Sequence, residues 1–251
     1  AIIRAAEKTA MPAGVFNMIY GGSVGAWLVQ HPAIKAVGFT GSLGGGRALC
    51  DMAAARPEPI PVFAEMSSIN PMLVLPEALN VRAEKIAAEL AASVVLGGGQ
   101  FCTKPGLVLG IASPQFEHFL DRLGHLIQAH APHTLLNAGG LCNFSDGLGR
   151  LASHPGLRHL AGHPQQGSQA FPQLYAADVA LLLDGDPLLQ HEVFGPMLVA
   201  VTVSDAEQLK QAVHSLQGQL TATLIAEPAD FSAFADLVPL LTIFSREVSF
   251  P

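Results

Sequence analysis

A short apolar run that leads through a glycine-rich turn into a helical segment is the feature that most limits the folds open to this chain. The run is Ala36–Thr40, the glycines lie within Gly41–Gly46, and Arg47–Ala55 has helical character. A strand followed by a turn and a helix is the repeating unit of α/β folds. The sequence therefore predicts an α/β protein.

Apolar runs and amphipathic segments continue to alternate along the chain. Short apolar runs favour strands, whereas apolar residues spaced three and four apart favour helices. Ser204 and Glu207 have the spacing of a capping box at a helix start. Residues 137–172, rich in Gly, Pro, Gln and His, are expected to be the least regular part, and a last helix and strand lead toward Pro251. We expect helices at residues 1–10, 24–31, 80–96, 114–130 and 204–217, and strands at residues 15–20, 62–65, 70–75, 106–111, 174–183, 197–203 and 221–226.

Charge and hydropathy argue against two classes of partner. The net charge is −7 and Lys and Arg form no cluster, so no nucleic-acid partner is expected. The sequence has no apolar run of about eighteen residues, so no membrane span is expected. Cys50, Cys102 and Cys142 include no C-x-x-C pair, which favours a reducing, cytoplasmic location over a disulfide framework.

Cys102 is the candidate nucleophile. It follows Gly97–Gly99, where the backbone can turn sharply and lie close to a ligand, and Pro105 prevents the helix from resuming. Cysteine is the most nucleophilic ordinary side chain and suits attack on a carbonyl carbon. The alternative is that this thiol is a small buried hydrophobe, which is the commoner use of a lone cysteine.

The Gly41–Gly46 turn and Glu65 each have two interpretations as well. Free N–H groups at a strand-to-helix turn suit a diphosphate, but a glycine-rich turn can equally serve close packing. Among apolar neighbours Glu65 would have a raised pKa, as a general base needs, but it could instead cap or pair at a domain crossing. His118 and His125 lie seven residues apart without a third ligand, so no metal site is expected.

Four segments in this order resemble the aldehyde dehydrogenase superfamily. They are F-T-G-S at residues 39–42, A-E-M-S-S-I-N-P at 64–71, G-Q-F-C-T-K-P-G at 99–106 and E-V-F-G-P at 192–196. The second and third are most similar to the branch of α-ketoglutarate semialdehyde and long-chain fatty aldehyde dehydrogenases. Most of the superfamily has E-L-G-G-K where this chain has Glu65-Met-Ser-Ser-Ile.

The resemblance implies an aldehyde dehydrogenase-like fold. Residues 1–65 would be the second part of a Rossmann-type cofactor-binding domain, and residues 66–251 would be the α/β catalytic domain. Cys102 would be the nucleophile and Glu65 the base. NAD or NADP would be the cofactor, held by residues that include Gly41, Ser42, Gly46, Glu192 and Phe194. The complete protein is expected to be a homo-oligomer.

The reaction implied is oxidation of an aldehyde to a carboxylate through a thiohemiacetal and a thioester on Cys102. The aldehyde would be α-ketoglutarate semialdehyde or a fatty aldehyde. Two alternatives remain open, namely a cysteine-dependent hydrolase that uses one of the ten histidines as its base, and a non-catalytic fragment.

The chain looks like an incomplete piece of such a protein. Residues 1–10 read as the middle of a helix, and the resemblance places the first cofactor-binding strands, an asparagine oxyanion donor and a C-terminal end outside this sequence. Charged residues make up only 13% of the chain and hydrophobic residues 50%, as expected where other protein surface covers it. We expect the chain alone to bind cofactor weakly and to self-associate.

Overall fold

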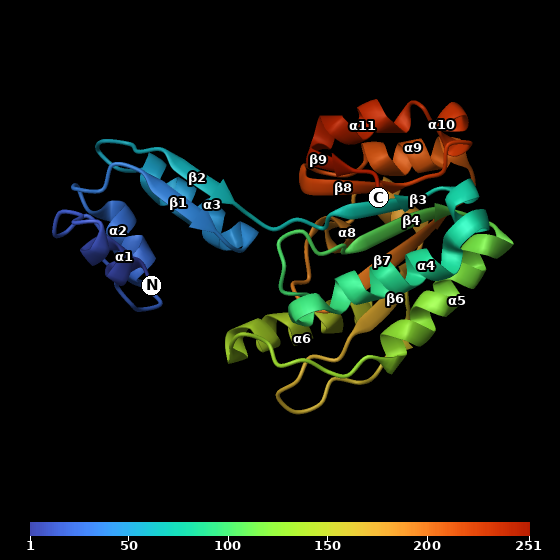
Figure 1. Cartoon of the computed structure of the whole chain (residues 1–251), viewed down its shortest axis with the longest axis horizontal. Helices are drawn as coiled ribbons and strands as arrows, with labels where there is room; N and C mark the ends of the chain where they lie inside the picture. Colours follow the sequence, from blue (N-terminus) through green and yellow to red (C-terminus); the bar gives the residue numbers. More distant parts are fainter. The chain divides into compact units, whose positions relative to one another are not determined.

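The computed structural model describes all 251 residues, which form two compact units, Ala1–Ser67 and Ser68–Pro251 (Figure 1). Both units mix helices with mainly parallel strands, so the predicted α/β class is confirmed. The expected domain boundary, between residues 65 and 66, lies close to the division between the units. The functions expected for the two domains remain predictions.

The first unit is built around the strand–turn–helix segment. Its elements are α1 (Ile2–Lys8), α2 (Val24–Gln30), β1 (Val37–Thr40), α3 (Leu43–Ala54) and β2 (Val62–Glu65). Strands β1 and β2 pair in parallel, with Val37 opposite Val62 and Thr40 opposite Glu65. The two strands therefore end side by side, and α3 starts just beyond β1.

The strand predicted at residues 15–20 is wrong. Those residues form no regular element, and the large side chains of Val15, Met18, Ile19 and Tyr20 are exposed. An apolar run becomes a strand only where another strand satisfies its N–H and C=O groups. No strand of the structure pairs with this segment.

The second unit contains a seven-stranded sheet in the order β5-β6-β7-β4-β3-β8-β9. All neighbouring strands are parallel except β5 and β6. The central strands β3, β4 and β7 are buried almost throughout, as expected for parallel strands covered on both faces. The strands are β3 (Pro71–Val74), β4 (Leu107–Ile111), β5 (Leu157–Gly162), β6 (Gln173–Ala177), β7 (Met197–Val203), β8 (Gln219–Ile225) and β9 (Ser245–Ser249).

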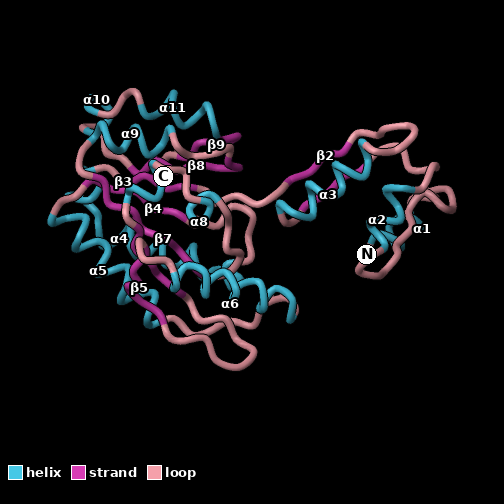
Figure 2. The backbone as a smooth tube through the Cα atoms, turned by 180° about the vertical axis from the view of Figure 1, so that it is seen from behind, coloured by secondary structure: helices cyan, strands magenta, loops and turns pink.

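Helices cover both faces of this sheet (Figure 2). Successive strand residues point to opposite faces, so Leu73 and Val74 belong to different hydrophobic clusters. The cluster around Val74 contains α4 (Pro76–Val95) and α5 (Pro114–Ala129), which lie together in Figure 1. The cluster around Leu73 contains residues of α6 (Ala138–Ser153), α7 (Val179–Leu183), α8 (Pro187–Gln190), α9 (Ala206–His214) and α11 (Leu237–Phe244). It also contains Phe234, which follows α10 (Asp230–Ala233).

Three expectations in the second unit need correction. Residues 137–172 are not irregular throughout, because α6 and β5 lie there, and α6 buries Phe144, Leu148 and Leu151. The strand expected at residues 174–183 ends at Ala177, where Asp178 caps α7 with its carboxylate. The N-cap of α9 is Asp205 rather than Ser204, because the Asp205 carboxylate accepts a hydrogen bond from the Gln208 N–H at 2.9 Å. In return, Gln208 Oε1 accepts a hydrogen bond from the Ser204 N–H at 2.7 Å.

Most other expected elements are present with boundary shifts. The strands at residues 62–65 and 197–203 have the expected bounds, whereas α3 and α4 each begin four residues earlier than expected. The early start of α3 places Gly44–Gly46 inside the first turns of the helix rather than in a loop. None of the helices has both the length and the apolar character that a membrane crossing requires.

Candidate active site

The loop that carries Cys102 begins where α4 ends. Gly97, Gly98 and Gly99 all have φ between 57° and 68°, a conformation that side chains with a Cβ atom rarely adopt. A Cβ atom on Gly99 would lie 2.3 Å from the carbonyl carbon of Gly195, so the two backbones are in direct contact. The structure therefore brings together two segments that sequence analysis singled out separately, residues 99–106 and 192–196.

Cys102 lies at the surface, in a turn that follows these glycines. Its carbonyl oxygen accepts a hydrogen bond from Asn70 Nδ2 at 2.8 Å. Its N–H donates to no protein acceptor. An exposed thiol next to a free backbone donor can take part in attack on a carbonyl group and stabilise the oxyanion that forms.

Asn70 is a buried residue that sequence analysis assigned no role. Besides the Cys102 carbonyl, Nδ2 donates to the Lys104 carbonyl at 3.0 Å, while Oδ1 accepts from the backbone N–H and hydroxyl of Thr221. Its φ of 45° is one that Asn tolerates better than most residues. Asn70 therefore connects the Cys102 turn to the N-terminal end of β8. The only local signal for it was the Asn-Pro pair, which marks a turn.

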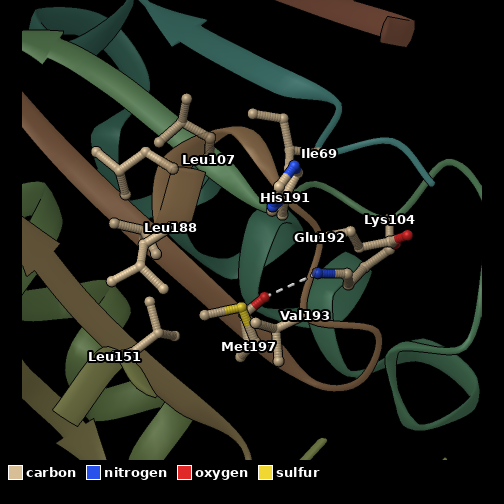
Figure 3. Close-up of a pocket in the computed structure, with 12 residues that line it drawn as sticks. Ile69, Lys104, Leu107, Leu151, Leu188, His191, Glu192, Val193 and Met197 are labelled. Atoms are coloured by element: carbon tan, nitrogen blue, oxygen red, sulfur yellow. Dashed lines mark hydrogen bonds between the residues drawn. The ribbon is translucent and has the colours of Figure 1, made fainter. Parts of the chain in front are cut away.

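Lys104 is also buried, and only 2% of its surface is exposed. Its Nζ donates to the Met197 carbonyl at 3.0 Å (Figure 3). Burial lowers the pKa of this lysine to about 8, and the charge of Glu192 works in the opposite direction. Sequence analysis missed this residue, because a lysine beside a cysteine gives no local sign that it will be buried.

Glu192 lies between α8 and β7 and is part-buried. Burial raises the pKa of its carboxyl group, while the Lys104 charge and the Ser68 backbone N–H lower it. Its Oε1 is buried and has no hydrogen-bond partner. Phe194 in the same segment is 46% exposed. The segment thus presents an unsatisfied acceptor and an open aromatic ring.

Gly195 completes this segment with a φ of 149°. A Cβ atom there would lie 2.4 Å from Phe144 Cδ2 in α6, so no side chain fits. Glycine is therefore required at position 195 by both its backbone angle and its neighbours.

The candidate diphosphate turn belongs to the first unit. Ser42 caps α3 and accepts the Gly45 N–H at 3.2 Å, and the Gly41 N–H donates to the Glu65 carbonyl at 3.0 Å. The N–H groups of Ser42 and Gly44 have no protein acceptor. A Cβ atom on Gly46 would lie 2.5 Å from Met66 Cγ, so Gly46 allows close packing of α3.

Glu65 is the last residue of β2 and is part-buried. Its backbone holds the Gly41 turn, whereas its carboxylate makes no hydrogen bond or ion pair within the structure. The capping or pairing role considered for this side chain is therefore not seen. It remains a candidate base.

Three histidines, among them His118 of the pair considered as metal ligands, have partners within the chain. His118 contacts Glu84 at 2.8 Å, and His159 and His163 contact Gln173 and Gln128. No group of three potential ligands comes together in the structure.

Comparison with known proteins places this chain in an established family. The model of the aldehyde dehydrogenase family matches residues 1–132, slightly more than half of the chain. The chain belongs to the aldehyde dehydrogenase family.

Two curated relatives narrow the resemblance. The chain is 48% identical over its whole length to alpha-ketoglutaric semialdehyde dehydrogenase of Acinetobacter baylyi, and 43% identical over 96% of its length to alpha-ketoglutaric semialdehyde dehydrogenase 2 of Azospirillum brasilense. It covers 48% and 46% of those two proteins, so it spans about half their length.

Among solved structures, the NAD-dependent benzaldehyde dehydrogenase of Corynebacterium glutamicum shares the fold. Its TM-score is 0.80 at 21% identity, and the match covers 98% of this chain and 53% of that one.

Proposed function

We propose that the protein containing this chain oxidises a short, acidic aldehyde such as α-ketoglutaric semialdehyde to the carboxylate, with NAD or NADP as cofactor. The observation that carries the proposal is the backbone contact between Gly99 and Gly195, which holds the Cys102 turn against the Glu192 segment. The names of the two curated relatives favour the short semialdehyde over a fatty aldehyde.

The residues of this chain fit a nicotinamide dinucleotide. Ser42 and Gly44 offer two free N–H donors at the start of α3, where a diphosphate is favoured, and Gly41 precedes them in the turn. Glu192 is part-buried and precedes the exposed Phe194 by two residues, and its carboxylate suits a ribose hydroxyl. Phe194 offers an exposed ring for the nicotinamide region. When bound, the cofactor supplies the hydride acceptor.

The chemistry proposed for Cys102 has two halves. In the first, the thiolate attacks the aldehyde carbon, the Cys102 N–H stabilises the oxyanion of the thiohemiacetal, and loss of hydride leaves a thioester on sulfur. In the second, Glu65 takes a proton from water, which adds to the thioester carbon. Collapse of that adduct releases the carboxylic acid and the Cys102 thiolate.

The remaining proposals concern the protein as a whole. The three cysteines of this chain form no disulfide, which supports a reducing, cytoplasmic location. Exposed apolar side chains such as Tyr20 and Trp27 need other protein surface to cover them, either from the rest of the full-length protein or from a second copy, and we propose that the full-length protein is a homo-oligomer. No histidine hydrogen-bonds to Cys102, so no observation favours the hydrolase alternative.

A panel of aldehydes assayed on the full-length protein with NAD and with NADP tests the substrate and cofactor together. We expect formation of reduced cofactor to be fastest with α-ketoglutaric semialdehyde, and slower with aldehydes that lack the carboxylate. A preference for long-chain aldehydes would contradict the substrate assignment. Absence of cofactor reduction with every aldehyde would contradict the reaction.

A further inference from the structure

Lys104 connects the two segments of the candidate site through both its backbone and its side chain. Its carbonyl oxygen accepts from Asn70, its N–H donates to the Phe101 carbonyl at 3.1 Å, and its Nζ reaches the Met197 carbonyl. Phe101 immediately precedes Cys102, and Met197 begins the strand that follows the Glu192 segment. The Lys104 side chain therefore connects the Cys102 turn to the start of β7, directly after the Glu192 segment.

Lys104 and Glu192 line the same small cavity. Of the residues that line it, only Lys104, His191 and Glu192 are titratable, and most of the others are aliphatic, including Leu107, Leu151 and Leu188 (Figure 3). The cavity volume is about 20 Å³, room for roughly one water molecule and far too little for a substrate. Within this cavity the polar groups therefore act on one another, and no substrate enters it.

An unpaired charge in a small, mostly aliphatic cavity has a high desolvation cost, so a nearby charge of opposite sign is expected. Nζ has only one hydrogen-bond acceptor, the Met197 carbonyl, which is neutral. Glu192 is the only carboxylate that lines the cavity, and its Oε1 is buried without a donor. The two groups form no direct ion pair, but each is the opposite charge nearest at hand across the cavity and acts on the other through it.

We propose that Lys104 is a positioning residue, whose ammonium group fixes the Cys102 turn to the Met197 carbonyl and holds the Glu192 carboxylate in its charged form. This inference rests on the proposed function, because it assigns Glu192 to the cofactor. Lys104 itself touches neither substrate nor cofactor. It acts through Glu192.

The first test measures the lysine directly and needs no enzyme activity. Full-length protein labelled with ¹³C at lysine Cε is titrated by NMR, and the Lys104 resonance is identified by its loss in Lys104→Met. Without the Glu192 charge, Glu192→Gln should lower the Lys104 titration midpoint by about half a pH unit or more. The control Glu207→Gln, at an exposed position of α9, should leave it unchanged. An unchanged midpoint in Glu192→Gln would overturn the proposal.

The second test separates positioning from simple packing. Single-turnover hydride transfer is measured for Lys104→Met, Glu192→Gln and the double variant. If Lys104 acts through Glu192, each single change slows transfer about tenfold or more, and the double variant is scarcely slower than the slower single variant. Independent effects that multiply would overturn the proposal.

If Lys104→Met fails to fold, the NMR titration of Glu192→Gln still tests the proposal, and the Lys104 resonance is then identified by its loss in Lys104→Arg. Absence of dehydrogenase activity would count against the proposed function and leave the NMR result intact.

Discussion

Gly99 and Gly195 are in backbone contact, and a Cβ atom on Gly99 would lie 2.3 Å from the Gly195 carbonyl carbon and 2.5 Å from Pro196 N. The obstacle is main chain, so no side-chain rotation can relieve it. This contact joins the turn before Cys102 to the segment that carries Glu192. The geometry of the proposed site therefore depends on a glycine at position 99, which has no Cβ atom.

Replacing Gly99 with alanine should disturb both segments at once. The new Cβ collides with backbone and forces a positive φ on a residue that disfavours it, which together should cost roughly 2–4 kcal/mol in the free energy of unfolding. Urea denaturation measures the loss. The matched control is Gly149→Ala, where a Cβ in α6 meets nothing within 4 Å. That change should be neutral or stabilising by up to about 1 kcal/mol. Equal effects of the two variants would contradict the contact.

Replacing Asn70 with aspartate should loosen the Cys102 turn without a change in side-chain size. The carboxylate still accepts from Thr221, but it has no N–H to donate to the Cys102 and Lys104 carbonyls. A buried anion facing two carbonyl oxygens should cost at least about 2 kcal/mol of unfolding free energy and slow hydride transfer. The exposed Asn80→Asp change serves as control. Unaltered stability of Asn70→Asp would show that these hydrogen bonds do not hold the turn.

Cys102 and Asn70 differ in whether their roles can be predicted from the sequence. Cys102 was predicted as the nucleophile from its own segment and the order of the four motifs, because both can be read along the sequence. The main partners of Asn70 lie 32 and 151 residues away, so its role appears only when the chain is folded. The burial of Lys104 and the Gly99–Gly195 contact are of the same kind.

The fold shows the same division between local and long-range information. The strand predicted at residues 62–65 is present because the short apolar run there has a parallel partner in β1. The run at residues 15–20 looks similar in sequence but has no partner. Helix α6 was missed although Leu141, Phe144, Leu148 and Leu151 follow helical spacing, because glycines between them made the segment look like a loop.

Lys104 should make stability depend on alkaline pH. Its pKa is about 8 in the folded chain, whereas an unburied lysine of the unfolded chain has the ordinary value of 10.5. The folded chain therefore binds this proton less tightly than the unfolded chain. The free energy of unfolding should therefore rise between pH 8 and 10.5, by on the order of 3 kcal/mol from this group. Urea denaturation across that range, compared with Lys104→Met, isolates the contribution. Identical slopes for the two proteins would mean that Lys104 does not titrate in this window.

Replacing Glu65 with glutamine should separate the two halves of the reaction. Hydride transfer does not require the base, so one equivalent of reduced cofactor per active site should form rapidly, whereas hydrolysis of the thioester should slow about a hundredfold or more. Stopped-flow absorbance distinguishes the burst from the steady state. Loss of the burst together with turnover would show that Glu65 is needed before the thioester forms.

The most direct measurement of the central claim compares two cysteines in the full-length protein. Cys102 and Cys142 are both free and exposed, so replacing either with alanine removes a similar thiol from the surface. With α-ketoglutaric semialdehyde and cofactor in excess, Cys142→Ala should produce reduced cofactor at the unmodified rate. Cys102→Ala should bind cofactor with unchanged affinity and produce none. Aldehyde-dependent reduction of cofactor by Cys102→Ala would contradict the account.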